Sequence, residues 1–382
     1  FAEHDAFTED DAFTQHDAYI KAFEGLHLEQ VWDVHTHLLG VGDSGSGCTV
    51  HTNTEQWWHP LEVVRRKAIL NAACVATHSE SVDAQYVNQL LRQIQDFPAP
   101  MQWCLFAFDH ACDSAGQVCA DQSTFHVPNA YAQHIAAANA GRFQWVASIH
   151  PRRLDALQQL EQAKANGAVA VKWLPSAMNI DLRDTRNRAF YDALHRLDLP
   201  LIVHCGEEKA VPGAGQDALG NPLHVRAPLQ AGVRVIVAHL ASLGSASDDD
   251  RRSAPQRPAF ELFTRLMDEP AWRNLLLGDI SAIFQRNRPV SVWQQVLRQQ
   301  DWHPRLLAGS DYPLPGVMPL YSTAKLVQAG LLDQQLAAWL DELRQYNTLL
   351  FDFILKRHLR CQGQGFLACV FETQEKLKRS NA

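Results

Sequence analysis

Residues 31–37, VWDVHTH, open with apolar side chains and end in two histidines separated by one residue. A short run rich in β-branched and aromatic residues predicts a strand, and alternate residues of a strand share one face. We therefore expect His35 and His37 to point the same way at the end of a buried strand. An H-x-H pair alone is weak evidence for a metal site, because core histidines are common.

Seven further segments of the same kind follow along the chain. They are WCLFAFD (103–109), QWVASIH (144–150), AVAVKWL (168–174), PLIVHCG (200–206), RVIVAHL (234–240), NLLLGDI (274–280) and RLLAGSD (305–311). Near-continuous apolar strands are typical of a parallel sheet buried on both faces, and helical patterns lie between them. Eight such strands predict a closed α/β fold, the (β/α)8 TIM barrel, rather than an open sheet.

The chain of 382 residues divides into three predicted parts. Residues 1–30 contain a short hexad repeat and are expected to form an N-terminal arm, laid over the barrel or over a neighbouring subunit. Residues 31–360 form the barrel, with a helical insertion over 59–96 after the first strand. Residues 361–382 form a C-terminal tail, and its polar end, 375–382, is expected to fray.

Composition and charge argue against several classes of protein. Lysine and arginine number 34 against 42 aspartates and glutamates, a net charge of −8, which disfavours a nucleic-acid partner. No apolar run approaches the roughly 18–20 residues of a membrane helix. The eight cysteines include no C-x-x-C pair and are expected to be reduced thiols. We expect a cytoplasmic protein with a small-molecule partner, and a homo-oligomer is left open.

Other predicted strand ends supply more side chains of the kind that bind metals. Strands four, five, six and eight carry Lys172, His204, His239 and Asp311. Buried charge is costly unless it is paired or bound to a metal, and a barrel builds its active site at the strand ends. With the histidine pair of strand one, this set suits a Zn²⁺-type ion with an open position for water.

Five of these strand ends carry longer motifs. They are DVHTH (33–37), VKWLP (171–175), IVHCGEE (202–208), VAHLAS (237–242) and GSDYPLP (309–315). In this order they resemble the amidohydrolase superfamily, in particular its amidohydrolase-2 branch of hydrolases, lactonases and decarboxylases. The resemblance implies that His35, His37 and His204 bind a divalent metal, that Asp311 touches it and handles the proton, and that His239 binds metal or polarises substrate.

The resemblance implies a metal-dependent hydrolase. Its metal, most simply Zn²⁺ with Mn²⁺ as the alternative, lowers the pKa of water to about 7, and the hydroxide attacks the carbonyl of an ester, lactone or amide. Asp311 then acts as the catalytic proton carrier, and His239 stabilises the oxyanion. The same ligands serve a metal-dependent decarboxylase, a carbon–carbon lyase acting on a small carboxylated substrate, and this alternative stays open.

The number of metal ions turns on Lys172. In binuclear members of the superfamily a strand-four lysine is carbamylated and bridges two metals, which makes Lys172 a candidate ligand. The other explanation is an ion pair of Lys172 with Asp311, Glu207 or a carboxylate of the substrate. The Lys-Trp-Leu-Pro context at 172–175 is closer to the one-metal branch, so one ion is favoured over two.

Two residues near the metal motifs are candidate substrate contacts. Glu207 and Glu208 follow His204, and we favour Glu207 of the two. Trp173 is next to Lys172, although strand alternation points its side chain to the opposite side, where core packing is the default.

Arginines in the predicted mouth loops are candidates for binding an anionic substrate. Arg226, Arg286 and Arg288 lie in such loops, and arginine suits bidentate recognition of a carboxylate. Of these we select Arg226 as a substrate contact. Surface charge is the simpler explanation for all three, because the chain has 34 basic residues.

Overall fold

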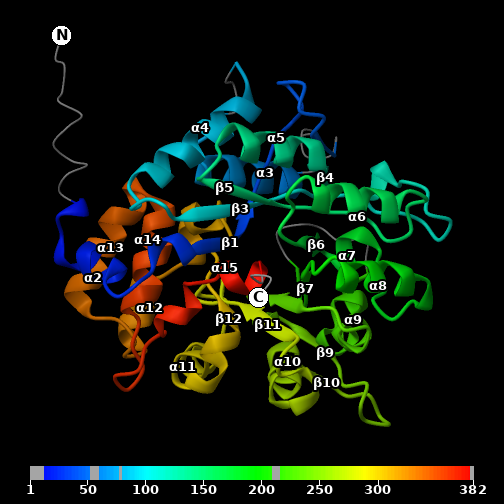
Figure 1. Cartoon of the computed structure of the whole chain (residues 1–382). Helices are drawn as coiled ribbons and strands as arrows, with labels where there is room; N and C mark the ends of the chain where they lie inside the picture. The colour runs from blue at the N-terminus through cyan, green and yellow to red at the C-terminus, as the bar shows by residue number, and fades with distance from the viewer. Residues whose placement is uncertain (1–12, 52–59, 77–79, 209–215, 379–382) are drawn as a thin grey trace.

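Eight parallel strands form a ring among the described residues. The structure, a computed structural model, describes residues 13–51, 60–76, 80–208 and 216–378. The strands are β1 (Trp32–His37), β3 (Gln102–Phe106), β5 (Phe143–Val146), β6 (Val171–Trp173), β7 (Leu201–His204), β8 (Val235–Ala238), β11 (Leu276–Asp279) and β12 (Leu306–Leu307). Each overlaps a segment predicted as a strand, and Figure 1 shows helices around the ring. The predicted TIM-barrel fold is confirmed.

Backbone hydrogen bonds close the ring. The order β1-β3-β5 forms one group of strands and β12-β11-β8-β7-β6 the other. A parallel bridge between Ala147 and Val171 joins the groups on one side. On the other side, the backbone N–H of Asp311 donates to the carbonyl of His35 at 2.8 Å. Two strand ends that carry predicted metal ligands are therefore bonded directly to each other.

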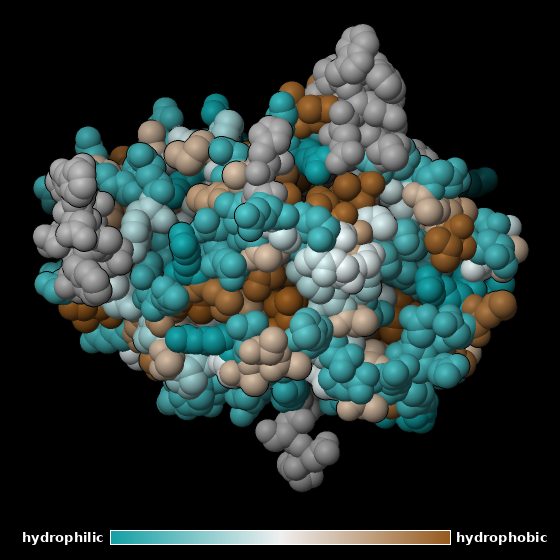
Figure 2. Space-filling model, turned by 90° about the horizontal axis from the view of Figure 1, so that it is seen from above, coloured by the Kyte–Doolittle hydropathy of each residue, from teal (hydrophilic) through white to brown (hydrophobic). Residues whose placement is uncertain are grey.

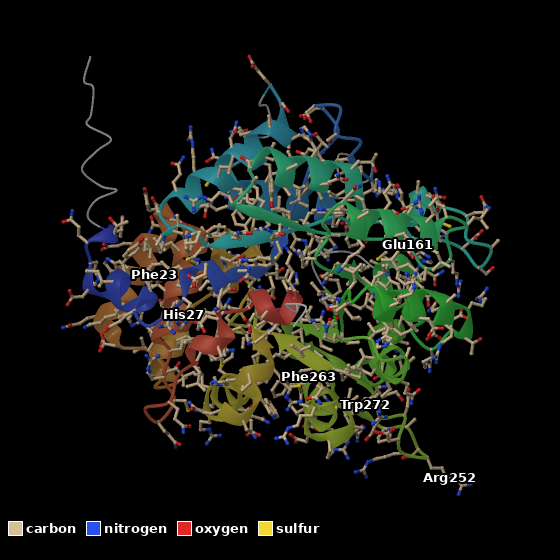
Figure 3. All side chains as sticks on the ribbon, viewed as in Figure 1. Phe23, His27, Glu161, Arg252, Phe263 and Trp272 are labelled. Atoms are coloured by element: carbon tan, nitrogen blue, oxygen red, sulfur yellow. The ribbon has the colours of Figure 1, made fainter. Side chains whose placement is uncertain are left out.

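Helices cover the outside of the ring. They are α3 (Pro60–Ala72), α4 (Val82–Gln95), α5 (Asn129–Ala138), α6 (Ala156–Ala165), α7 (Pro175–Met178), α8 (Arg188–Arg196), α9 (Arg226–Gln230), α10 (Ala259–Asp268), α11 (Val290–Arg298), α12 (Thr323–Gln328), α13 (Gln334–Tyr346) and α14 (Thr348–His358). α10 illustrates the packing: Phe263 points from it toward the barrel, as Figure 3 shows. A Cβ atom at Gly278 of β11 would lie 2.9 Å from the Phe263 ring, so glycine permits this close approach.

Helices α3 and α4 lie between β1 and β3, within the stretch predicted as a helical insertion. Two short antiparallel pairs lie in the strand-to-helix connections. β2 (Thr49–Val50) pairs with β4 (Phe125–His126), and β9 (Ser245–Ser247) pairs with β10 (Gln256–Pro258). That α3 and α4 are an insertion relative to other barrels stays a prediction.

A β-bulge in β1 directs the histidine pair into the barrel. Val34 and His35 together oppose Cys104 of β3, which is the two-against-one pairing of a bulge. Trp32 and the first bulge residue, Val34, belong to the apolar cluster inside the barrel. A one-residue change of register exchanges the two faces of a strand. From the second bulge residue onward, His35 and His37 therefore also face the interior.

The C-terminal segment packs under the barrel. Leu377, in the short helix α15 (Gln374–Leu377), is 1% exposed and belongs to the interior cluster of the barrel. Thr373 Oγ1 donates to the carbonyl of Trp32 at 2.7 Å, and Lys376 Nζ donates to that of Leu306 at 2.7 Å. The expected fraying is wrong as far as residue 378, because one leucine in the polar run reaches the apolar end of the barrel.

The described part of the N-terminal arm lies against the body of the molecule. It forms α2 (Asp17–Phe23), and the Phe23 ring stacks on Phe353 of α14 with centroids 4.9 Å apart. Figure 3 shows Phe23 on this helix beside the C-terminal helices. Tyr19 adds a hydrogen bond from its hydroxyl to the carbonyl of Asp96 at 2.8 Å. Residues 1–12, which hold most of the hexad repeat, lie outside the described residues.

The face seen from above is largely polar. Figure 2 shows mostly hydrophilic residues on it, with hydrophobic ones near its centre and at a few places along its edge. Of the helices that the structure describes, none combines the length and the apolar character that crossing a membrane requires.

Candidate active site

One cavity gathers most of the predicted site residues at the carboxyl ends of the strands. It has a volume of about 220 Å³. Its lining includes the residues predicted from strands one, four, five, six and eight and the two glutamates: His35, His37, Lys172, His204, Glu207, Glu208, His239 and Asp311. Leucine and valine side chains form much of the remaining wall, together with Arg65, Gln285, Asn287 and Arg288. The cavity therefore combines a group of ionisable side chains with a partly apolar wall.

His35, His37 and Asp311 form the tightest group in this cavity. Asp311 Oδ1 is 3.3 Å from His35 Nε2 and 3.1 Å from His37 Nε2. Tetrahedral coordination with bonds of about 2.0–2.1 Å separates neighbouring ligand atoms by about 3.3 Å. Both measured separations match this value, and the three ligand atoms all lie within 4.8 Å of one another. These three residues fit the predicted metal site.

Two imidazole nitrogens in the cavity lack a hydrogen-bond partner among the described residues. They are Nε2 of His35 and Nε2 of His204, both buried. Burial holds the pKa of His35 well below its usual value, and the nearby Lys172 adds to this effect. Burial also lowers the pKa of His204, against the opposing influence of Glu208. Both rings are therefore neutral near pH 7, which is the form that binds a metal ion.

His204 faces the same cavity but stands apart from the His35–His37–Asp311 group. Its ring centroid is 5.2 Å from that of His239, and its Nδ1 is 3.4 Å from Oε2 of Glu208. The structure thus brings three of the four predicted ligands into one close cluster. Within the described chain, the closest groups of ligand atoms are His35–His37–Asp311 and His35–His239–Asp279.

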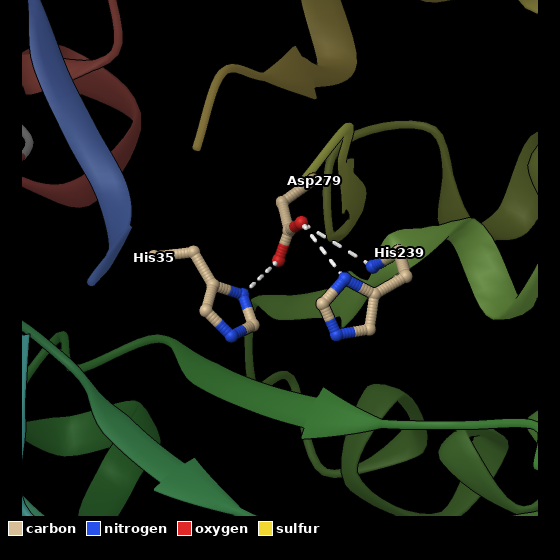
Figure 4. A group of neighbouring side chains, drawn as sticks. All are labelled: His35, His239 and Asp279. Atoms are coloured by element: carbon tan, nitrogen blue, oxygen red, sulfur yellow. Dashed lines mark hydrogen bonds and ion pairs between the residues drawn. The ribbon is translucent and has the colours of Figure 1, made fainter. Parts of the chain in front are cut away.

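Asp279, at the end of β11, is a site residue that sequence reasoning missed. Its Oδ2 accepts a hydrogen bond from Nδ1 of His35 at 3.0 Å. Its Oδ1 accepts from the backbone N–H of His239 at 3.2 Å and of Ser281 at 3.0 Å. Figure 4 shows the carboxylate between the two imidazoles. A proton on Nδ1 leaves Nε2 of His35 free to act as the ligand, facing Asp311.

His239 turns into the cavity because the backbone after β8 adopts a left-handed conformation. Its φ is 53°, and Asp311 has a comparable φ of 61°. Non-glycine residues seldom adopt such angles, and they gather at functional sites. Nδ1 of His239 donates to the carbonyl of Ser281 at 3.0 Å, so Nε2 is the acceptor. Burial, reinforced by His35, holds the pKa of His239 well below its usual value.

Lys172 extends into the barrel above the ring of Phe106. Its Nζ is 5.3 Å from the ring centroid and has no hydrogen-bond partner within the described residues. Burial lowers the pKa of Lys172, although Asp279 and Asp311 favour the charged form. In the described structure Lys172 forms no salt bridge with Asp311 or Glu207. Two explanations for a lysine at this buried position therefore remain. One is an ion pair with a carboxylate of the substrate, and the other is carbamylation of Nζ.

Arg288 is a second buried cation in the cavity wall. Its guanidinium donates to Oε1 of Gln285 at 2.5 Å, to Oδ1 of Asn287 at 2.6 Å and to Oγ of Ser242 at 3.3 Å. All three acceptors are uncharged, and burial lowers its pKa. Arg288 has no salt bridge to any carboxylate among the described residues. Sequence reasoning grouped it with surface arginines and did not select it.

The structure brings neither Arg226 nor Trp173 to the cavity. Arg226 lies at the start of α9 and forms ion pairs of 2.6 Å with Asp250 and with Glu269. Trp173 is fully buried on the outer side of β6, where its Nε1 donates to the carbonyl of Ile149 at 2.8 Å. Both substrate contacts are therefore corrected, since local ion pairs and core packing account for these side chains.

The two glutamates line the cavity, and Glu208 is the one beside a predicted ligand. Its Oε2 is 3.4 Å from Nδ1 of His204, and its side chain is 12% exposed. The backbone N–H of Glu207 instead donates to the carbonyl of Leu243 at 2.9 Å, at the rim of the cavity. The preference for Glu207 over Glu208 therefore has no support in the geometry.

Comparison with solved structures gives proteins of low sequence identity. An uncharacterized TIM-barrel protein from Bordetella bronchiseptica is 15% identical, with 78% of this chain and 99% of that chain covered and a TM-score of 0.49. The 5-carboxyvanillate decarboxylase of Novosphingobium aromaticivorans, complexed with manganese and 4-hydroxy-3-methoxy-5-nitrobenzoic acid, is 10% identical (91% and 96% covered, TM-score 0.48). The apo IDCase of Metarhizium anisopliae is 13% identical (86% and 98% covered, TM-score 0.45).

Sequence comparison identifies the family. No curated protein sequence matches the chain. The amidohydrolase-2 family, described as Amidohydrolase, matches residues 32–342, which is most of the chain and includes every strand of the barrel. The matched region also holds the histidines and aspartates of the cavity. This chain belongs to the amidohydrolase-2 family.

Proposed function

We propose that this metal-dependent amidohydrolase-2 enzyme removes CO₂ from a small carboxylated substrate. One observation carries the proposal: two buried cations, Lys172 and Arg288, line the cavity, and neither forms a salt bridge within the described residues. Buried cations are costly without an anionic partner. A substrate carboxylate supplies that partner. A decarboxylase always requires such a group, whereas a hydrolase does so only for particular substrates.

The uncharged partners of Arg288 favour this role. The amide oxygens of Gln285 and Asn287 fix the plane of the guanidinium without neutralising its charge. The Nζ atom of Lys172 has no hydrogen-bond partner among the described residues. The residue as a whole is 3% exposed. Nη2 of Arg288, which donates to none of these acceptors, and the Lys172 ammonium would together hold one carboxylate.

The metal-binding residues fit a divalent transition metal. His35 Nε2, His37 Nε2 and Asp311 Oδ1 would hold it, with His204 Nε2 as the next available donor. Neutral imidazoles and one carboxylate suit Zn²⁺ or Mn²⁺. When bound, the ion supplies positive charge that polarises a substrate oxygen next to the reacting carbon. We favour one ion, and carbamylation of Lys172 would accompany a second.

The residues around this site can carry the proton that the reaction consumes. When the bond between the carboxylate and its neighbouring carbon breaks, the electron pair stays on that carbon and CO₂ leaves. A proton must then reach the same carbon. Asp311 would deliver it from its carboxyl group and recover a proton from water. His239, whose Nδ1 donates to Ser281, would present Nε2 to the substrate.

Hydrolysis of an ester, lactone or amide is the second candidate. The observation that favours it is a second carboxylate in the same cavity, Glu208, whose Oε2 is 3.4 Å from Nδ1 of His204. Hydrolysis uses a carboxylate to accept a proton from the attacking water and to return it to the leaving group. Both candidates need the same metal ligands.

Release of CO₂ separates the two candidates. The chain, loaded with Zn²⁺ or Mn²⁺, is incubated with a panel of small carboxylates and, separately, with esters, lactones and amides. We expect CO₂ from one or more carboxylates and no product from uncharged esters. Arg288→Met should lower kcat/KM for that carboxylate. Turnover of uncharged carbonyl substrates without CO₂, unaffected by Arg288→Met, would favour hydrolysis and contradict the proposal.

A further inference from the structure

We propose that a second, apolar chamber beside the metal cavity binds a hydrocarbon substituent of the substrate, about as large as a six-membered ring. This inference rests on the proposed function, which makes the substrate a small carboxylate, and it adds that this carboxylate has an apolar substituent. The chamber lies between α3, the start of α4 and the β2–β4 pair. It has a volume of about 130 Å³.

The lining of the chamber is almost entirely apolar on three sides. Leu39 and Val41 come from the segment after β1, Leu70 from α3, and Val50 and Phe125 from the β2–β4 pair. Charged lysine-, arginine- or carboxylate-type side chains line it only from α3, where Arg65 Nη1 forms a 2.8 Å ion pair with Glu62 Oε1, and the other polar members of the wall are His37, Tyr86 and Thr124. Such a wall excludes a second charged group of the substrate and accepts hydrocarbon.

The chamber adjoins the metal cavity. His37, Arg65, Ile69 and Leu314 line both. His37 is the essential member of this set, because its Nε2 is 3.1 Å from Asp311 Oδ1 on the side of the metal cavity. A substrate atom held near His37 therefore has the metal cavity on one side and the apolar chamber on the other.

Asp83 makes the wall of the chamber rigid. Its carboxylate accepts hydrogen bonds from the backbone N–H of Val41 at 2.6 Å and from the hydroxyls of Ser44 at 2.8 Å and Ser46 at 2.6 Å. Tyr86, also in the chamber wall, donates from its hydroxyl to the carbonyl of His37 at 2.7 Å. The segment that follows β1 is thereby tied to α4. A preformed chamber binds its ligand without the cost of ordering a loop.

The volume sets the size of the substituent. An apolar protein cavity of ~150 Å³ holds one benzene molecule. A chamber of about 130 Å³ therefore accepts a phenyl ring or a chain of a few methylene groups. Burying each methylene tightens binding about fourfold, because the transfer is worth about 0.8 kcal/mol. Affinity should rise with chain length until the chamber is full and should then level off.

Binding of two homologous series tests the proposal without knowledge of the substrate. Dissociation constants are measured by calorimetry and ligand-observed NMR for acetate to heptanoate and for ethanol to heptanol, with the Zn²⁺-loaded full chain. We expect both series to gain about fourfold per methylene up to about five carbons. Val50→Phe and Val41→Phe, which fill the chamber, should abolish this gain. Val64→Phe, the same change on an exposed residue of α3 outside both cavities, should preserve it.

The two series separate the chamber from the proposed function. Affinity that does not depend on chain length in the wild-type protein overturns the chamber, whatever the variants do. An unchanged gain in folded Val50→Phe or Val41→Phe protein also overturns it. Carboxylates that bind no more tightly than alcohols of equal length contradict the proposed carboxylate site, while the gain with length still reports on the chamber.

Discussion

Replacing Asp279 by asparagine should weaken metal binding without removing a metal ligand. Three donors converge on Oδ1 of Asp279: the backbone N–H groups of His239 and Ser281, at 3.2 and 3.0 Å, and the hydroxyl of Ser281. Asparagine has one acceptor oxygen, so that oxygen should stay with these donors. Its NH₂ group then faces Nδ1 of His35, which in the native protein donates to Oδ2 at 3.0 Å.

The consequence is a change of tautomer in His35. Nδ1 must now accept a hydrogen bond, so the proton of the neutral ring moves to Nε2, the nitrogen that faces Asp311. A protonated Nε2 cannot bind a metal ion. Loss of a carboxylate that orients a metal-binding histidine costs about 10- to 100-fold in affinity, or about 1.4–2.7 kcal/mol.

Competition with a chelator of known affinity measures this effect. Asp109→Asn is a matched control, because Asp109 is also a buried carboxylate that accepts two backbone N–H groups, those of His110 and His150, each at 2.8 Å. Both variants should lose some unfolding free energy in urea, but only Asp279→Asn should bind Zn²⁺ less tightly. Wild-type metal affinity in folded Asp279→Asn protein would refute the assigned role of Asp279.

Four further outcomes follow from the same geometry. Joint replacement of His35 and His37 by alanine should leave desalted protein without bound metal, as elemental analysis would record, and undiminished metal content would refute the site. Asp311→Asn should fold and lose about 10²- to 10⁴-fold in kcat, and wild-type turnover would remove it from proton transfer. Arg288→Lys should raise KM for carboxylates more than it lowers kcat, since the planar guanidinium held by Gln285 and Asn287 is lost. Burial lowers the pKa of His150 to about 4, so the unfolded chain binds the extra proton first, and this residue alone should lower stability by up to about 3 kcal/mol between pH 6.5 and 4. Urea unfolding at both pH values checks this, because His150→Gln should reduce the loss of stability by that amount and an unchanged loss would contradict it.

The barrel could be predicted from the sequence because its strands are buried on both faces. Such strands appear as near-continuous apolar runs, and all eight were visible in this way. The bulge in β1 could not be predicted, because alternation alone puts Val34 and His35 on opposite faces. In the structure, Val34 and His35 both lie opposite Cys104. This pairing explains why the core residues and the predicted metal ligands of β1 all face inward.

The candidate site was predicted where its residues end a strand and missed where their role depends on distant partners. Asp279 is the last residue but one of the run NLLLGDI (274–280) and lies two residues after the inward-facing Leu277, which would have placed it on the inner face. Arg226 and Arg288 look alike in sequence. Arg226 forms ion pairs with Asp250 and Glu269, which lie 24 and 43 residues further along the chain. Arg288 donates hydrogen bonds only to uncharged groups. Sequence spacing contains no information on such pairings.

An anomalous difference map of crystals loaded with Mn²⁺ tests the central claim most directly. We predict one peak in contact with His35 Nε2, His37 Nε2 and Asp311 Oδ1, with Lys172 unmodified. Two peaks about 3.5–4 Å apart flanking a carbamylated Lys172 would establish the binuclear site instead. A peak among Nδ1 of His35, His239 and Asp279, or no peak at all, would contradict the account.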